Sequence, residues 1–303
     1  MSRYLPFTTV GTTVQEMTSH EAMTSAGLDY QVERTDLVSG GVLLSKHTGL
    51  SKVTPDKIEV LDATVSSTQA IFQHDEVFAT VDRAIGEVGA HYVAARELRG
   101  GLGMELWAKL PDTIQVAGFD PVSTYIRATN WNDGSKPFSM RLESWRMVCT
   151  NGLHSLTAKG NEVRLRHTKH ADLSELQAGE LFGMVSDHTQ RITTVGDAML
   201  NTDMTEFQFS AALDRLFPVD WQGSTRHINA VMKAREKAFS MLYAPTQDGI
   251  RDTAWGGYQS VVEYADWATA SKTAAQRAER QLKGTYDGLK TRAFEVFTAG
   301  VLV

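Results

Sequence analysis

The feature that most constrains the fold is a change in hydrophobic periodicity near residue 170. Before it, short runs alternate apolar and polar residues between glycine-rich turns, a pattern typical of antiparallel β-hairpins. After it, apolar residues recur every three or four positions in long segments separated by Pro218, Pro245 and Gly249, which stop helices. The sequence therefore predicts an α+β fold, with an α+β domain over residues 1–170 and an all-α helical domain over residues 171–303.

The first domain is expected to contain antiparallel β-hairpins packed with one helix. Residues 66–88 carry an apolar face at helical spacing, formed by Ile71, Val77, Phe78, Val81 and Ile85. Hairpin turns are predicted at Gly40–Gly41, at the glycines of residues 100–103, and at Asn132-Asp133-Gly134. The glycines of residues 100–103 lack the Lys-Ser/Thr ending of a phosphate-binding loop, so we interpret them as a turn between two strands.

Composition places the chain among ordinary globular proteins. Hydrophobic residues make up 42% and charged residues 22% of the sequence, which argues against a disordered or fibrous protein. No apolar run approaches the roughly 18 residues that cross a bilayer, and the start lacks the basic and apolar segments of a signal peptide. The single cysteine, Cys149, cannot form an intrachain disulfide. We therefore expect a cytoplasmic protein that does not associate with membranes.

Charge is unevenly distributed along the chain. Residues 121–170, called the basic segment below, contain eight basic and three acidic side chains and so carry +5, whereas the whole chain carries −6. Aromatic residues are interleaved with the cations, as in grooves where cations hold the phosphates of a single strand and rings stack on its bases. The alternative interpretation is a solvated sheet face with aromatic residues in the core. The residues expected to contact DNA are Arg127, Trp131, Lys136, Arg141, Arg146, Arg164 and Arg166, with Trp145 as a second candidate for stacking.

The sequence offers no clear catalytic, metal or cofactor site. Cys149 lies five positions before His154, but a lone cysteine at the end of a strand is expected to pack as a small apolar residue. His167 and His170 have the spacing of a ligand pair, yet no second pair matches them. Walker-type, Rossmann and nucleophile-elbow patterns are absent. We therefore expect no catalytic residue, no metal and no cofactor.

Four motifs occur in order along the chain, between about residues 20 and 298. They are LRGGLG (98–103) with WAKLP (107–111), YIRATN (125–130) with Asp133-Gly134, WRMVCTNGL (145–153), and TAWGGYQSVVEY (253–264) with LKTRA (289–293). Together they resemble the domain of unknown function family 932, which is carried by temperate phages, prophages and conjugative plasmids. The resemblance implies mobile-element biology and an association with DNA metabolism, and it supplies no established reaction.

The chain departs from the family pattern at three places. Gln259-Ser260 stand where the family tends to show Asn-Ala, and Asn151-Gly152-Leu153 stand where it tends to show Asn-Thr-Leu. Asp266-Trp267 stand where an Asp-His pair is usual. A mechanism that depends on a histidine at position 267 is therefore excluded for this chain.

These observations predict a phage- or plasmid-encoded protein of DNA transactions. It is expected to bind or anneal single-stranded DNA during recombination, as a homo-oligomer in the cytoplasm of a bacterial host. The order of hairpins, long helix and later helices is similar in plan to phage single-strand annealing proteins. Annealing requires only a groove that holds phosphates and leaves bases exposed.

Two other classes of function stay open. One is a protein-binding effector that inhibits a host defence or nucleic-acid enzyme, for which an acidic chain is suited. The other is a nuclease or another enzyme, which would require a cluster of carboxylates that a single sequence does not reveal.

Overall fold

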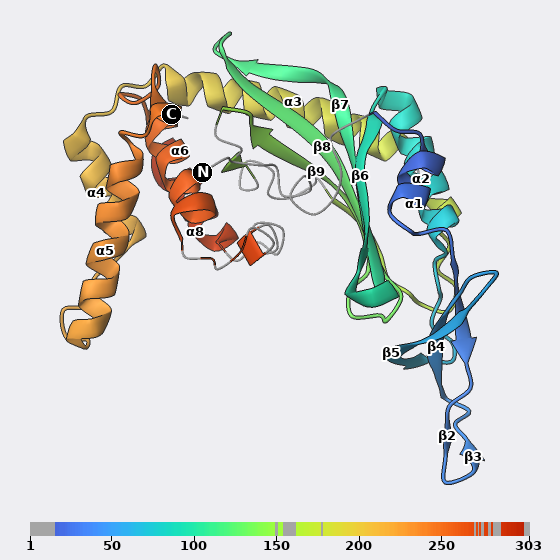
Figure 1. The fold of residues 1–303 in the computed structure, drawn as a ribbon. Helices are drawn as coiled ribbons and strands as arrows, with labels where there is room; N and C mark the ends of the chain where they lie inside the picture. The colour runs from blue at the N-terminus through green and yellow to red at the C-terminus, as the bar shows by residue number, and fades with distance from the viewer. Residues whose placement is uncertain are drawn as a thin grey trace.

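The computed structural model describes residues 16–148, 151–153, 162–176, 178–269, 271, 273, 276, 277, 280 and 286–299. These residues form an elongated arch, with a central antiparallel sheet, a three-stranded arm at one end and helices at the other (Figure 1). Strands dominate the first half of the chain and helices the second. The α+β class predicted from the sequence is therefore confirmed.

The arm is an antiparallel sheet that projects from the arch. Its strand order is β1–β4–β5, formed by β1 (Gln31–Thr35), β4 (His47–Val53) and β5 (Ile58–Ser66). A small hairpin of β2 (Val38–Ser39) and β3 (Val42–Leu43) extends beyond it (Figure 1). The turn of this hairpin is at Gly40–Gly41, as predicted, and both glycines have positive φ.

Two helices of the first half lie against the central sheet. They are α1 (Ser19–Ser25), capped by Thr18, and α2 (His74–Val88). The apolar side of α2 is buried, as the spacing predicts, but the helix begins at His74 instead of residue 66. The reason is that β5 continues to Ser66, and a capping box between Gln73 and Glu76 sets the start of the helix.

The central sheet is antiparallel, in the order β10–β9–β8–β7–β6, and β11 also pairs with β9. Its strands are β6 (His91–Leu98), β7 (Gly103–Val116), β8 (Asp120–Trp131), β9 (Phe138–Arg146), β10 (Asn151–Gly152) and β11 (Glu162–Leu165). The predicted turns join β6 to β7, through the short helix η1 (Arg99–Gly101), and β8 to β9. Gly103 is required at the first of these because a Cβ would lie 2.7 Å from the carbonyl oxygen of Asn130.

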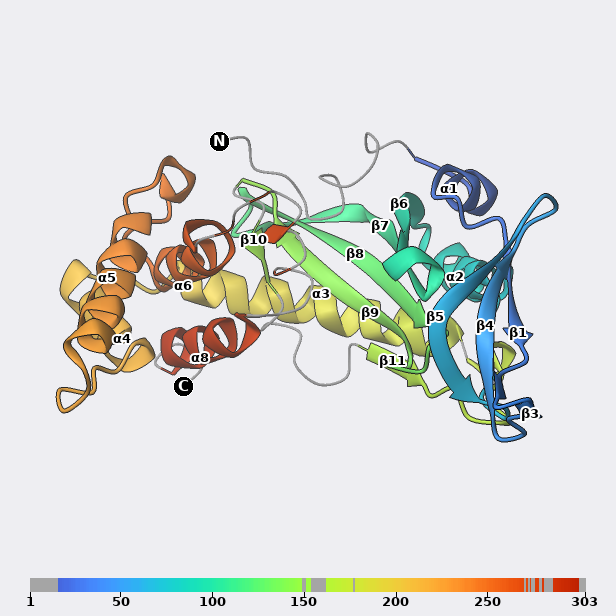
Figure 2. The ribbon, with the colours of Figure 1, turned by 60° about the horizontal axis from the view of Figure 1, so that its bottom comes forward.

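The two faces of the central sheet have different neighbours. Side chains alternate between the faces along each strand, and one set packs with α1, α2 and the first part of α3 to form the first core. Leu106, Ile126 and Met140 belong to this core. The opposite face lies on the inside of the arch and is turned toward the viewer in Figure 2, with α3 behind the sheet. It is called the inner face below.

The second half of the chain is helical. Its helices are α3 (Ala178–Leu200), α4 (Glu206–Leu216), α5 (Thr225–Met241), α6 (Ala254–Glu263) with the π-helical turn η5 (Tyr264–Ala268), and α8 (Asp287–Thr298). Two short 3-10 turns, η3 (Leu173–Glu175) and η4 (Pro245–Gln247), connect these elements. Among the described residues, no helix combines the length and the apolar character that a membrane span requires.

The helices form a second core, which includes the end of the central sheet. Trp255 and Phe209 of the helices share this core with Val116 of β7 and Val122 of β8. Helix α3 contributes to both cores, because it contacts the first near its start and the second through Ile192 and its later residues. The division into domains at residue 170 stays a prediction, and α3 and the sheet are shared across it.

Candidate functional site

The inner face of the central sheet carries a small cluster of buried aromatic side chains. Trp107 of β7, Tyr125 of β8 and Trp145 of β9 form this third core together with Val93. The rings of Trp107 and Tyr125 meet edge to face, with centroids 6.3 Å apart. Because Trp145 is fully buried, its ring is not placed to stack on a nucleic-acid base.

Five charged side chains form a ladder across four strands of the inner face. Arg96 of β6 pairs with Glu105 of β7, and Arg127 of β8 pairs with both Glu105 and Glu143. Arg141 of β9 completes the ladder by pairing with Glu143. The strand register sets Arg127 directly opposite Arg141, so the carboxylates offset a repulsion between like charges.

Glu105 and Arg127 of the ladder keep their charges although Glu105 is fully buried and Arg127 is largely buried. Burial alone would raise the pKa of Glu105, but Arg127 and Arg96 outweigh it and hold this pKa below its usual range. Burial alone would lower the pKa of Arg127, but Glu105 and Glu143 raise it. Both groups are therefore charged at neutral pH, and each neutralises much of the other.

A cleft of about 680 Å³ opens over the ladder. This volume lies within the range of about 300–1,000 Å³ that is usual for ligand sites. The charged residues that line it are the basic Arg96, Arg99, Arg127, Lys136, Arg141 and Arg164 and the acidic Glu97, Glu105, Glu162 and Asp287. The cleft thus presents cations beside carboxylates and is not a uniformly basic groove.

Trp131 lies in the cleft wall and supports two exposed cations. The guanidinium carbon of Arg99 lies 5.3 Å, and Nζ of Lys136 lies 5.4 Å, from the centroid of its ring. Arg99 has a φ of +48°, which a residue other than glycine rarely adopts. Since the ring itself is nearly buried, Trp131 positions cations and does not offer a free face to a base.

Most of the residues predicted to contact DNA meet in this cleft. Five of the seven line it: Arg127, Trp131, Lys136, Arg141 and Arg164. Arg166 follows β11, is exposed and lies outside the lining. The structure therefore brings the predicted residues to one site, while DNA binding itself stays a prediction.

The contributions of β6 and β7 to the cleft are missed by sequence reasoning. Arg96, Arg99 and Glu105 lie outside the basic segment, so a search by local charge does not find them. The sequence signal that could place Glu105 in the cleft is the alternation along β7, where Glu105, Trp107 and Lys109 share a face. Arg96 is opposite Glu105 only in the observed register of β6 and β7.

Arg146, the remaining predicted contact, lies in a buried junction between the sheet and the helices. Its Nε donates to the carboxylate of Asp120 at 2.7 and 2.9 Å, and its Nη1 donates to the carbonyl oxygen of Thr246 at 2.8 Å. The indole Nε1 of Trp255 donates to the same carboxylate at 2.7 Å. A guanidinium enclosed in this way cannot reach a phosphate. Arg146 therefore has a structural role, and we remove it from the residues predicted to contact DNA.

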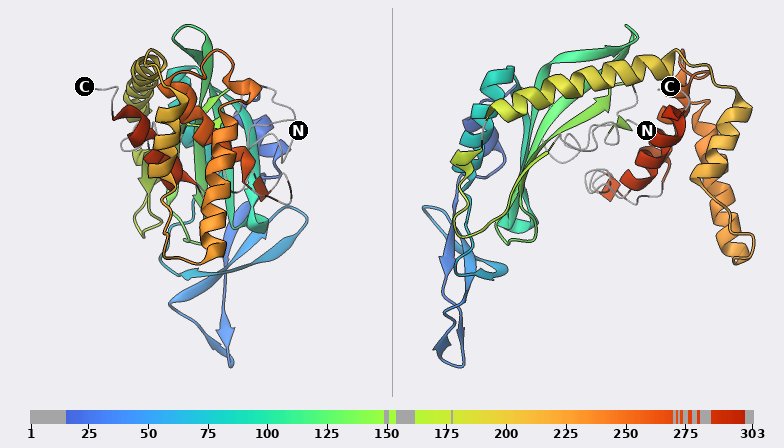
Figure 3. Two further views of the ribbon diagram at one scale, coloured as in Figure 1. Left: turned by 90° about the vertical axis from the view of Figure 1, so that its left-hand side faces the viewer. Right: turned by 180° about the vertical axis from the view of Figure 1, so that it is seen from behind.

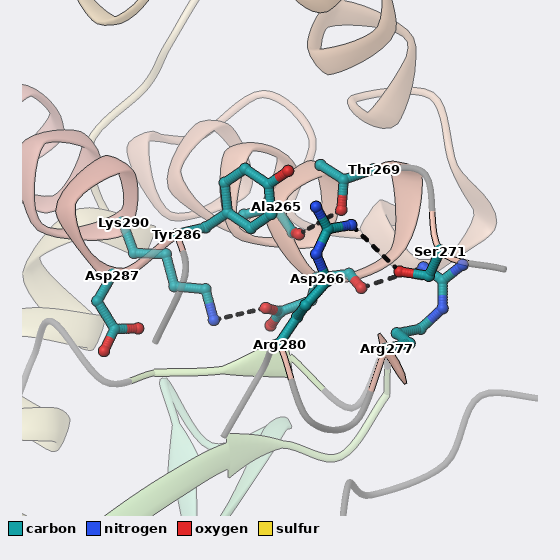
Figure 4. Close-up of a pocket in the computed structure, with 9 residues that line it drawn as sticks. All are labelled: Ala265, Asp266, Thr269, Ser271, Arg277, Arg280, Tyr286, Asp287 and Lys290. Atoms are coloured by element: carbon teal, nitrogen blue, oxygen red, sulfur yellow. Dashed lines mark hydrogen bonds and ion pairs between the residues drawn. The ribbon is translucent and has the colours of Figure 1, made fainter. Parts of the chain in front are cut away.

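A second ion pair completes the junction. Nζ of Lys290 lies 2.6 Å from Oδ1 of Asp266, and Oδ2 of Asp266 accepts the backbone N–H of Gly152 at 3.0 Å. Figure 4 shows the pair in the wall of a small cavity, which Arg280 and Tyr286 also line. The cavity measures about 10 Å³, which is about the volume of one water-sized probe. The pair therefore fastens α8 and η5 to the edge of the sheet and is not a ligand site.

A serine and a histidine are hydrogen-bonded on the face of the sheet that α3 covers. Ser144 Oγ lies 2.6 Å from Nε2 of His188 and 2.7 Å from Oγ1 of Thr124. Burial lowers the pKa of His188 to about 4, so the ring is neutral at pH 7. Both side chains are fully buried, and the pair therefore joins α3 to the sheet without access to a substrate.

Histidines and acidic residues do not form a metal site in the part of the chain that the structure describes. No group of three or more His, Cys, Asp and Glu side chains converges there as ligands. His167 directs Nδ1 toward the carbonyl oxygen of Ala70 at 3.1 Å, and burial lowers its pKa. Cys149 and His154 lie outside the described residues.

The comparisons with known proteins give a family and no described relative. Comparison with curated proteins and with solved structures finds no match. A family model described as Domain of unknown function (DUF932) matches residues 63–284, which include the central sheet and helices α3 to α6 but not α8. The match extends over more than half of the sequence, and the chain therefore belongs to the DUF932 family.

Proposed function

We propose that this protein binds single-stranded nucleic acid in the cleft of the inner face and acts in the DNA transactions of a phage or plasmid. One observation carries the proposal. A cleft of ligand-binding size gathers the exposed cations Arg99, Lys136 and Arg164, of which Arg164 pairs with Glu162, beside the less exposed Arg127 and Arg141 of the ladder. Exposed cations can exchange their water for phosphate oxygens, and the ladder behind them, with three arginines and two glutamates, adds a net charge of +1.

The carboxylates of the cleft favour a ligand that also donates hydrogen bonds. Glu97, Glu162 and Asp287 line the same cleft, although Glu97 pairs with Lys52 and Glu162 with Arg164, so a simple polyanion meets charges of both signs there. The bases of a single strand present amino groups that can donate to carboxylate oxygens, while a duplex uses these groups in base pairing.

The volume of the cleft limits how much of a strand it holds. At about 680 Å³ it accommodates a short stretch of nucleotides and not a duplex about 20 Å across. A longer strand would therefore be held by several copies of the protein side by side. This is the arrangement that strand annealing during recombination requires, and the homo-oligomer is part of the proposal.

Fluorescence anisotropy with labelled oligonucleotides tests the proposal. We expect binding at low salt, with an affinity that falls as salt rises by a slope of about 0.7 per phosphate held. Oligo(dC) and oligo(dA) should bind more tightly than oligo(dT), because thymine lacks an exocyclic amino group. Absence of binding to all three at low salt, or equal binding to duplex, would overturn it.

A second candidate function is a protein-binding effector of a host enzyme. One observation favours it: the β2–β3 hairpin exposes the apolar side chains of Val38, Val42 and Leu43 at the end of the arm. Pull-down from host lysate, with and without nuclease, distinguishes the candidates. A host protein retained after nuclease treatment, and lost when Val42 and Leu43 are replaced by Ser, would support the effector.

A further inference from the structure

One surface of the arm lies along an edge strand and exposes both apolar and acidic side chains. β5 is an edge strand of the arm and exposes the side chains of Ile58 and Val60, which are 71% and 69% accessible. Exposed Asp56 precedes this pair in the turn, and exposed Asp62 follows it at a β-bulge. Exposed edge strands that carry apolar side chains tend to pair or become covered. We call these four residues the β5 surface.

The charges at the two ends of the β5 surface are available to a partner. Lys57 and Glu59 form an ion pair with each other at 3.0 Å. Neither Asp56 nor Asp62 forms an ion pair within the described part of the chain. A partner that suits this surface would therefore offer apolar side chains and two or more cations along one line.

A surface of that kind lies at the opposite end of the arch, on α5. Arg226, Lys233 and Lys237 are exposed and spaced by seven and four residues, so they share one face of this helix. Met232 and the acidic Glu236 are exposed to one side of this face, and Trp221 in the loop before the helix is 71% accessible. Tryptophan is among the residues that contribute most to protein interfaces. Figure 3 shows the arm and α5 at the two ends of the molecule.

The two surfaces are complementary in charge, polarity and length. The acidic ends of the β5 surface are separated by six residues, at most about 20 Å, because Asp56 lies in the turn before the strand and Asp62 lies at a bulge. The cations of α5 extend over eleven residues, about 16 Å along a helix. Each surface has apolar side chains next to its charges. Like charges would oppose a contact of either surface with its own copy, so the favourable contact joins two different surfaces.

We infer that the β5 surface of one copy binds the α5 surface of a second copy, so that the protein assembles head to tail. A contact between two different surfaces of identical chains leaves one of each unused, and it therefore continues into a ring or a filament. This inference gives a structural form to the oligomer in the proposed function. In such an assembly the clefts of successive copies follow one another.

A charge-reversal experiment on the full chain tests the contact without nucleic acid. The arm variant is Asp56→Lys with Asp62→Lys, and the α5 variant is Lys233→Glu with Lys237→Glu. All four positions are exposed, and circular dichroism with urea unfolding verifies that each variant is folded. Sedimentation velocity is measured at about 100 µM protein, a concentration that populates complexes with micromolar Kd.

The wild type should associate at low salt and dissociate as salt rises. Each variant alone should sediment as a monomer, because its altered surface meets an unaltered surface of equal sign. An equimolar mixture should form a complex, since α5 of the arm variant and β5 of the α5 variant are unaltered and form the wild-type contact, and the two altered surfaces also carry opposite charges. A monomeric wild type, variants that associate like it, or a mixture without a complex would each overturn the inference. If a host protein is instead the partner of the β5 surface, the wild type alone should be monomeric.

Oligonucleotide binding of the same samples separates this inference from the proposed function. If neither the variants nor their mixture associate, and the monomers still bind the oligonucleotide, only the head-to-tail contact is contradicted. Association that follows the charge-reversal pattern, with no binding of any oligonucleotide, would confirm the contact and remove the proposed function.

Discussion

Arg164 and Arg146 belong to the same basic segment and have opposite environments. The side chain of Arg164 is 65% exposed and lines the cleft, whereas that of Arg146 is 2% exposed and bonded to Asp120. The difference arises because the helices cover one of the two residues and not the other. β9 is covered by the helices where Arg146 lies, and β11 is at the edge of the sheet. A count of basic residues does not distinguish the two roles.

Removal of the Arg146 charge should destabilise the protein without affecting the cleft. Arg146→Gln leaves the Asp120 carboxylate buried without its cation, and we expect a loss of about 3–5 kcal/mol in the free energy of unfolding. Urea unfolding measures this loss. The affinity for an oligonucleotide should be unchanged under conditions where the variant is folded. A stable variant with weakened binding would return Arg146 to the set of DNA contacts.

At the scale of elements, the turns and helices follow from local signals, and the cleft does not. Gly40–Gly41 and Asn132–Gly134 turn the chain where predicted because glycine adopts positive φ without strain. The ladder depends instead on register. Between Tyr92 and Ala94 a β-bulge shifts the pairing of β6 with β7 and so brings Arg96 opposite Glu105. No pattern within either strand contains that information.

Two glycine substitutions should have opposite effects on stability. Gly86 lies in α2 with no atom within 4 Å of an added Cβ, so Gly86→Ala should stabilise the protein by up to about 1 kcal/mol. Gly256 lies in α6, where a Cβ would be 2.0 Å from the carbonyl oxygen of Ile250. Gly256→Ala should cost about 3 kcal/mol or more, because backbone must move. Urea midpoints measure both changes, and shifts of the same sign would refute the packing described for α6.

At the scale of the whole molecule, the fold concentrates positive charge at one site of an acidic protein. The chain carries −6, yet the basic segment folds so that four of its cations line one cleft, where cations of β6 and η1 join them. The negative remainder would keep a nucleic acid from spreading over other surfaces. Helix α3 and the buried junction hold the helices against the sheet, so Asp287 of α8 also reaches the cleft.

The most direct test of the central claim compares two double variants with the same loss of charge. Arg99→Ala/Lys136→Ala removes two exposed cations of the cleft, and Arg166→Ala/Lys169→Ala removes two exposed cations outside its lining. The Kd for oligo(dC) is measured for both across a range of salt. The first variant should bind about tenfold or more weakly, with a salt slope reduced by about 1.4, and the second should match the wild type. Equal losses in the two variants, or none in the first, would contradict binding in the cleft.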